Sequence, residues 1–142
     1  MGWEDAKFIV SQAGFHSAVA AAPGGVTEGL YGVASWEDIV SRMTHVPEAE
    51  KWGKAYKEQY GELPSGGAVL GRVGAMLTIN ALREAGPDLT TESFLDALES
   101  LKFSDKVTGV ETEMSETNHR AGSGIILSQV QDGIWRPVAE ME

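Results

Sequence analysis

The residue types that most often perform chemistry are few in this chain and far apart. His16, His45 and His119 stand in no HxxxH or HxxE pattern that would place two metal ligands on one face of a helix. The chain has no Cys, which excludes thiolate catalysis and Cys-based metal sites. His119 lies in a polar loop, where a solvated or structural histidine is the commoner finding. We therefore expect no bound metal.

The serines and glycines also match no catalytic or nucleotide-binding pattern. Ser11, Ser17 and Ser35 lack the G-x-S-x-G context of an activated nucleophile. The glycines of residues 65–74 are not followed by a Walker lysine, and no G-x-G-x-x-G follows a strand-like segment. We interpret the chain as non-catalytic and expect no cofactor.

A loop after the first apolar segment is the better candidate for function. A glycine-hinged loop at the carboxyl end of a strand in an α/β sheet exposes backbone groups, and here an aromatic ring, to a ligand. The alternative is that Phe15 packs on the Ala-rich segment that follows it. Trp36, just past a second strand, is either a pocket wall or a partly buried anchor. The candidate ligand-binding residues are Gln12, Ala13, Gly14, Phe15 and Trp36.

Composition limits the kinds of partner. The chain has 142 residues, enough for one domain or a piece of a larger one, and its 21 acidic and 11 basic residues give a net charge of −10. That charge opposes binding to nucleic acid or to an anionic membrane, so we expect a small ligand or a protein partner. No apolar run approaches a membrane span, and the first residues lack the basic and apolar regions of a signal peptide. A strand so close to the first residue is natural for a fragment of a longer chain.

The elements that must position these residues begin with short strands. Residues 7–11 (KFIVS) and 29–34 (GLYGVA) read as strands, and the Ala-rich residues 16–22 between them predict two helical turns. Pro23-Gly24-Gly25 ends those turns. We expect the second strand to run into an exposed crossing segment at Trp36.

Three helices follow. Residues 47–60 begin with a proline suited to the first helical position and end before Gly61. Residues 66–86 form a long helix with one apolar stripe, which includes Val69, Val73 and Leu77 and must be buried against another surface. Thr90 or Thr91 caps a third helix.

The chain ends in strands. Residues 107–110 and 125–131 read as strands, and Asp132-Gly133 is a strong two-residue hairpin turn before residues 134–138. Pro137 is acceptable there only at the edge of a sheet. The order strand, helix, strand, three helices and β-hairpin predicts an α/β fold.

Several strings, taken in order, resemble one family. These are WGKAYKEQYGELPS at residues 52–65, AMLTINALREAG at residues 75–86, DLTTESFLDAL at residues 88–98 and LSQVQDGIWRPV at residues 127–138. They are similar to the C-terminal part of type I periplasmic solute-binding proteins, the branched-chain amino acid (Leu/Ile/Val) receptor family of ABC importers. The resemblance covers nearly the whole chain.

The resemblance implies part of a two-lobe α/β fold that closes on a ligand like a clamshell. It assigns residues 1–27 to the end of the second lobe and residues 28–36 to a hinge crossing. Residues 37–105 would form the helical segment of the first lobe, and residues 106–142 the hinge return and the second-lobe hairpin. The missing N-terminal portion would hold the loops that grip the ligand's carboxylate.

Two departures from the family pattern bear on the ligand. Amino acid receptors of the family commonly offer an acidic residue from the loop corresponding to residues 12–15, which here reads Gln-Ala-Gly-Phe. Because a buried ammonium without a counter-charge is costly, aromatic or other organic acids, or amides, fit better than an α-amino acid. In addition, Arg72 stands where the family often has an aromatic residue.

The leading hypothesis is therefore a non-catalytic, substrate-binding fragment of an ABC importer. The resemblance implies a small organic solute and the transporter's membrane subunits as partners, and a periplasmic or extracellular location for the parent protein. One alternative is an interaction module that no longer binds ligand and pairs with a missing N-terminal lobe or with itself. Another is a ligand-sensing regulatory domain of the same fold.

Overall fold

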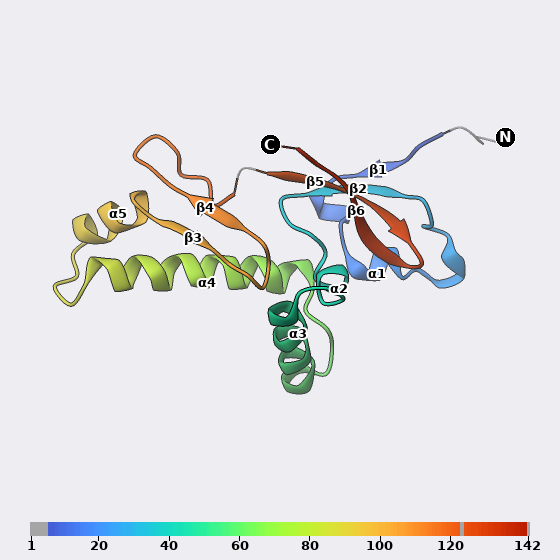
Figure 1. The fold of residues 1–142 in the computed structure, drawn as a ribbon, viewed down its shortest axis with the longest axis horizontal. Helices are drawn as coiled ribbons and strands as arrows, with labels where there is room; N and C mark the ends of the chain where they lie inside the picture. The colour runs from blue at the N-terminus through green and yellow to red at the C-terminus, as the bar shows by residue number, and fades with distance from the viewer. Residues whose placement is uncertain (1–5, 123, 142) are drawn as a thin grey trace.

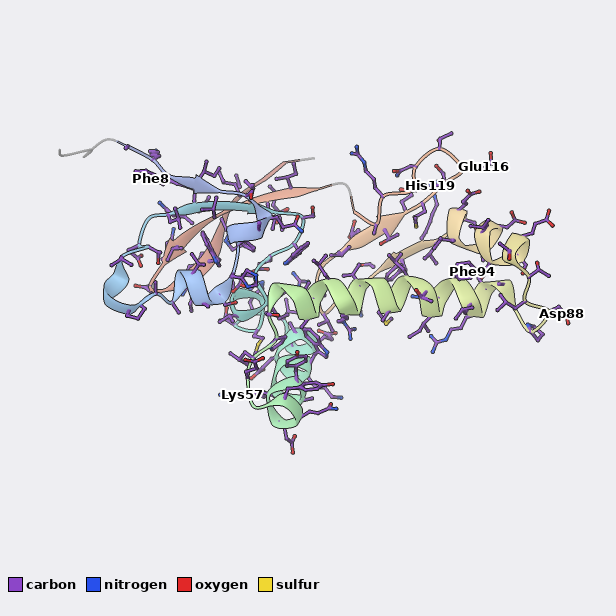
Figure 2. All side chains as sticks on the ribbon, turned by 180° about the vertical axis from the view of Figure 1, so that it is seen from behind. Phe8, Lys57, Asp88, Phe94, Glu116 and His119 are labelled. Atoms are coloured by element: carbon purple, nitrogen blue, oxygen red, sulfur yellow. The ribbon has the colours of Figure 1, made fainter. Side chains whose placement is uncertain are left out.

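A computed structural model describes residues 6–122 and 124–141. The molecule is elongated, with a four-stranded sheet at one end and a long helix that leads to a smaller α/β region at the other (Figure 1). Helix α3 projects from the middle, and Figure 2 shows Lys57 near its free end. Within the described residues, no helix is long and apolar enough to cross a bilayer.

The larger sheet has the strand order β1-β2-β5-β6. Strand β1 (Ile9–Val10) is parallel to β2 (Tyr31–Ala34), whereas β5 (Ile125–Gln131) and β6 (Ile134–Met141) form an antiparallel hairpin beside β2. Asp132 and Gly133 have φ values of 55° and 70°, which is the backbone of a two-residue primed turn. This confirms the predicted hairpin, and Pro137 lies on the edge strand, as its missing N–H requires.

The three predicted helices are present with bounds close to those expected. Helix α3 (Pro47–Tyr60) ends at Gly61, whose φ of 82° is readily adopted by glycine. Helix α4 (Gly66–Ala85) begins at Ser65, whose hydroxyl accepts from the backbone N–H of Ala68. Helix α5 (Thr91–Glu99) has a capping box between Thr90 and Ser93.

The core lies where the sheet meets the start of α4. It includes Phe15, Trp36, Val69 and Trp135, and Trp135 has no exposed surface. On α4, Val69, Val73 and Ala81 are buried by the chain itself, with α5 packed along the helix. The face of α4 that carries Val69, Val73 and Ala81 is therefore covered within the chain, and Leu77 is partly buried.

Two parts of the sequence fold differently from expectation. Residues 107–110, predicted as a strand, lie in a turn between β3 (Lys102–Ser104) and β4 (Glu111–Glu113), which pair with each other. The turn forms because the Asp105 carboxylate accepts from the Val107 N–H and the Thr108 hydroxyl, and because Gly109 has a φ of 75°.

The segment after β2 was expected to be an exposed crossing, and this was wrong. Trp36, Glu37, Asp38 and Ile39 are each less than 10% exposed. Asp38 caps a short helix, α2 (Ile39–Arg42), that the sequence analysis missed. The short helix α1 (Ser17–Ala20) lies within the predicted Ala-rich segment.

Candidate functional site

The loop after β1 is a single turn of 3-10 helix, Gln12–Gly14. The N–H of Gly14 donates to the Ser11 carbonyl (2.9 Å), and the N–H of Phe15 donates to the Gln12 carbonyl (3.1 Å). A Cβ on Gly14 would lie 2.9 Å from Cβ of Val10, so the turn folds back on β1 only because this residue is glycine. Gln12 and Ala13 are exposed. They are the two loop residues open to a ligand.

Of the two arrangements considered for Phe15, the structure shows the inward-packed one. Its side chain is 3% exposed, and its ring centroid lies 4.9 Å from that of Trp135. The indole N–H of Trp135 donates to the His16 carbonyl (2.9 Å), which fixes both rings below the loop. Gly32 makes room for them, since a Cβ there would lie 2.9 Å from the Phe15 ring. Phe15 therefore supports the loop from the core.

Trp36 and the start of α4 lie next to this loop. A Cβ on Gly66 would be 3.8 Å from the Phe15 carbonyl oxygen and 4.0 Å from Cζ2 of Trp36. Trp36 is 7% exposed, which favours the buried anchor over the pocket wall. The fold thus brings together the residues 12–15, Trp36 and the N-terminus of a 20-residue helix. Free N–H groups and the helix dipole favour negative charge at such an end.

Arg42 fastens α2 to the turn between β3 and β4. Its Nε donates to the Val107 carbonyl (2.9 Å) and its Nη2 to the Lys106 carbonyl (3.1 Å). Nη1 lies 3.4 Å from the carboxylate of Glu37. The guanidinium lies flat on Gly109, where a Cβ would come within 2.7 Å of it.

Arg72 fastens α4 to the same turn. Its Nε and Nη2 each donate to Asp105 at 2.9 Å, and its guanidinium carbon lies 5.4 Å from the ring centroid of Trp52. Desolvation raises the pKa of Asp105, but hydrogen bonds from Arg72 and Thr108 and the charge of Arg72 outweigh it, so the pKa is lowered. The aromatic expected at position 72 is thus replaced by an ion pair, and an Arg within an apolar helix was the sequence signal for it.

Beside Arg42 lies a cavity of about 720 Å³. It is lined by Ser35 and Glu37 from the segment after β2, by Gly109 and Glu111 from the β3–β4 region, and by Glu140 from β6. Three carboxylates and one guanidinium, that of Arg42, face it. It lies where chain segments pass between the two ends of the molecule.

The histidines are apart in space as well as in sequence. His45 lies 3.2 Å from Glu37 and His119 lies 3.1 Å from Glu99, while His16 is exposed. Figure 2 shows His119 beside Glu116 on a loop at the far end from Phe8. Among the described residues, no group of His, Asp and Glu is arranged to hold a metal ion.

Comparisons with known proteins agree on one family. A family model described as "Periplasmic binding protein" matches residues 1–134. No curated protein matches the sequence. A solved solute-binding protein of an ABC transporter from Rhodopseudomonas palustris BisB5, in complex with 3,4-dihydroxybenzoic acid, is 18% identical with a TM-score of 0.74. The match covers 96% of this chain and 37% of that one.

Two further solved structures are similar. A branched-chain amino acid ABC transporter protein from Thermus thermophilus with bound valine is 18% identical over 94% of this chain and 38% of its own, with a TM-score of 0.72. An R. palustris solute-binding protein with benzoate is 18% identical over 86% of this chain and 32% of its own, with a TM-score of 0.64. The chain spans less than two fifths of these proteins and adopts part of their two-lobe α/β fold, as predicted.

Proposed function

We propose, because the chain belongs to the periplasmic binding protein family, that it is a substrate-binding part of an ABC importer. In this proposal it binds a small organic acid, performs no catalysis and delivers the solute to the transporter's membrane subunits. The corresponding whole protein would lie in the periplasm or outside the cell. The proposal concerns a chain that spans 37% of a relative with bound 3,4-dihydroxybenzoic acid.

The lobe assignment is part of the proposal. Residues 1–27 and 106–142 would belong to the second lobe and its hinge return, residues 28–36 to a hinge crossing and residues 37–105 to the first lobe. The separation of the β1-β2-β5-β6 sheet from the region around α4 and α5 supports a division into two lobes (Figure 1), with β2 in the second-lobe sheet and β4 paired with β3 of the first lobe. Arg42 and Arg72 would then hold the segments that pass between the lobes.

The observation on which the choice of ligand rests is the chemistry of the exposed loop. Gln12 and Ala13 offer an amide and backbone groups but no carboxylate for an ammonium. The neighbouring N-terminus of α4 favours an anion. An aromatic or other organic acid, or an amide, fits this surface better than an α-amino acid.

Titration calorimetry with benzoate, 3,4-dihydroxybenzoate, benzamide and valine tests this choice. We expect weak binding of the aromatic ligands and none of valine, since much of the fold of the relatives lies outside this chain. The variant Ala13→Glu adds a carboxylate at an exposed position and should weaken benzoate binding about tenfold through like-charge repulsion. The uncharged variant Ala13→Gln is the matched control. Valine binding stronger than benzoate binding in the unmodified chain would refute the proposed ligand class.

A second candidate function is an interaction module, and the far face of α4 favours it. Ile79 and Leu82 are 40% and 41% exposed there, and Tyr60 on α3 is 60% exposed. A groove of about 450 Å³ between α3 and α4 is lined by Trp52, Tyr56 and Ile79, among others. Exposed apolar surface of this kind marks contact sites.

Sedimentation velocity distinguishes the two functions. If the chain is an interaction module, the unmodified chain should self-associate or bind a polypeptide that provides the part of the fold that this chain lacks. The double variant Ile79→Asp, Leu82→Asp should then be monomeric. Gln59→Asp, a polar substitution in the same groove, controls for added charge. A chain that stays monomeric at high concentration and binds benzoate favours the receptor function alone.

A further inference from the structure

A second cavity, of about 460 Å³, lies on the side of the sheet where α1 and α2 pack. It is bounded by α1, α2, the loop before α4 and the hairpin turn, and it contains none of the residues Gln12, Gly14 or Trp36. Its size lies in the range of small-molecule sites. Most of its lining is apolar: Ala18, Ala20, Ala21, Val40, Leu63, Pro64 and Ile134.

One of the polar residues in the lining carries a buried carboxylate. Asp38 lines the cavity and is 5% exposed. Its Oδ1 accepts from the Ser17 hydroxyl (2.8 Å) and its Oδ2 accepts from the Val40 N–H (3.2 Å). These bonds supply no positive charge. In the described part of the chain, the ion pairs of Lys, Arg and His are with other carboxylates.

The surroundings of Asp38 make its charge costly. Desolvation raises the pKa of Asp38, and the neighbouring anion Glu37 adds to that shift, while hydrogen bonds from the Ser17 side chain and from the backbone of Ser41 and Val40 oppose it. A buried anion without a counter-charge is unfavourable unless a cation reaches it. A bound ammonium would supply that missing charge.

The rest of the cavity also favours a cation. Of the described residues that line it, none is Lys or Arg, and its rim includes the exposed carboxylate of Glu62. Among the described lining residues, His16 is the one able to take a positive charge, and it is exposed and forms no ion pair with Asp38.

We propose that this cavity binds a small organic cation, an ammonium group joined to an apolar body. The ammonium pairs with the Asp38 carboxylate and the Ser17 hydroxyl, and the apolar body lies along the alanines of α1 and Leu63. The site does not depend on the proposed receptor function: it takes the opposite charge and is lined by none of Gln12, Gly14 and Trp36, although Ser65, the N-cap of α4, is part of its wall.

The test measures binding of 2-phenylethylamine to the 142-residue chain. Titration calorimetry gives the affinity, and NMR chemical-shift changes at Ser17 and Leu63 locate the site. Asp38→Asn keeps an N-cap residue and a hydrogen-bonding side chain, so α2 is retained while the charge is lost. We expect it to weaken binding about tenfold or more. Asp132→Asn removes an exposed carboxylate outside the cavity and should leave binding unchanged.

A second variant protects the test against misfolding of the first. Ala18→Phe fills the cavity from an exposed position and should also reduce binding about tenfold, by occupying the volume. The anionic analogue 3-phenylpropionate, in which a carboxylate stands in place of the ammonium, should not compete with the amine. Equal affinity for the amine in unmodified chain and Asp38→Asn, absence of binding at millimolar amine, or competition by 3-phenylpropionate would each overturn the proposal. Benzoate binding at the Gln12 loop is measured separately and should be unaffected by Asp38→Asn.

Discussion

Arg72→Met should destabilise the chain more than any other surface-accessible change on α4. Met keeps the unbranched aliphatic stem of Arg72 but removes both hydrogen bonds to Asp105. Asp105 is 4% exposed and would be left as a buried anion, whereas the side chain of Arg72 is 24% exposed. Most of the lost stability therefore comes from leaving the Asp105 carboxylate buried without its partner.

The size of the effect follows from that asymmetry. Removing one partner of a buried ion pair costs about 3–5 kcal/mol, and we expect the lower end, about 3 kcal/mol, because solvent reaches Arg72. Asp105→Asn leaves the guanidinium to be hydrated and should cost less, about 1–2 kcal/mol. In the Asp105→Asn background, Arg72→Met should then cost less than about 1 kcal/mol, since the interaction is already absent.

The effect should depend on pH in one direction. The pKa of Asp105 in the folded chain is lower than its ordinary value of 3.8, so the unfolded state takes up the proton first as pH falls. The stabilisation is fully present above that value and is lost as pH falls through the folded pKa. The unmodified chain and Arg72→Met should therefore converge in stability at low pH.

Urea unfolding monitored by tryptophan fluorescence measures these free energies at neutral and acidic pH. The measurements form a double-mutant cycle of four proteins: the unmodified chain, Arg72→Met, Asp105→Asn and the double variant. A coupling energy near zero, or a difference between unmodified chain and Arg72→Met that is independent of pH down to complete protonation of Asp105, would refute the argument.

Three further predictions test other parts of the fold. Phe15→Ala should lower the free energy of unfolding by about 3–5 kcal/mol because the ring packs on Trp135 in the core; a loss below 1 kcal/mol, with unfolding measured in urea, would contradict its burial. Gly109→Ala should lower the free energy of unfolding by about 1–3 kcal/mol, because a Cβ would lie 2.7 Å from the Arg42 guanidinium and the φ of Gly109 is 75°. Thermal unfolding followed by circular dichroism measures this loss, and Gly71→Ala, where a Cβ would meet open space, is the control. Asp38→Asn should leave the chain equally or more stable at neutral pH, because the raised pKa of Asp38 means that its ionisation opposes folding above pH 3.8, the ordinary value. The gain in stability should vanish below pH 3.8. A large loss of stability at neutral pH would contradict this argument.

Much of the secondary structure could be predicted because its signals are local. Pro47 and Gly61 delimit α3, Ser65 caps α4, and Asp132-Gly133 forms the hairpin turn. Each of these depends on one or two residues whose backbone preferences act in any surroundings.

The turn at residues 107–110 was mispredicted because its cause is not local. Val107, Thr108 and Val110 have the β-branched side chains typical of strands. The carboxylate of Asp105 accepts hydrogen bonds within the turn, and it is itself held by Arg72 from a helix 33 residues earlier. The strand propensity of these residues is therefore overridden by a contact with a residue far away in the sequence.

The candidate loop shows the same division. The sequence indicated that residues 12–15 form a loop after a strand and that it holds no acidic group. It did not show that Phe15 turns inward, because Trp135, its partner, is 120 positions away and reaches it only through the pairing of β2 with β5 and of β5 with β6. The exposed part of the site is thereby reduced to Gln12 and Ala13.

By itself, the sequence determined the three longer helices, the closing hairpin and their order, the family they resemble and the absence of a carboxylate in the loop. These follow from residue types and from spacings of a few positions, over which backbone geometry is set. Only the tertiary structure decided which face of α4 is buried, where the two arginines attach and that Asp38 lies buried without a counter-charge beside a cavity. Those outcomes depend on desolvation and on charges brought together from distant parts of the chain, and neither exists until the chain has folded.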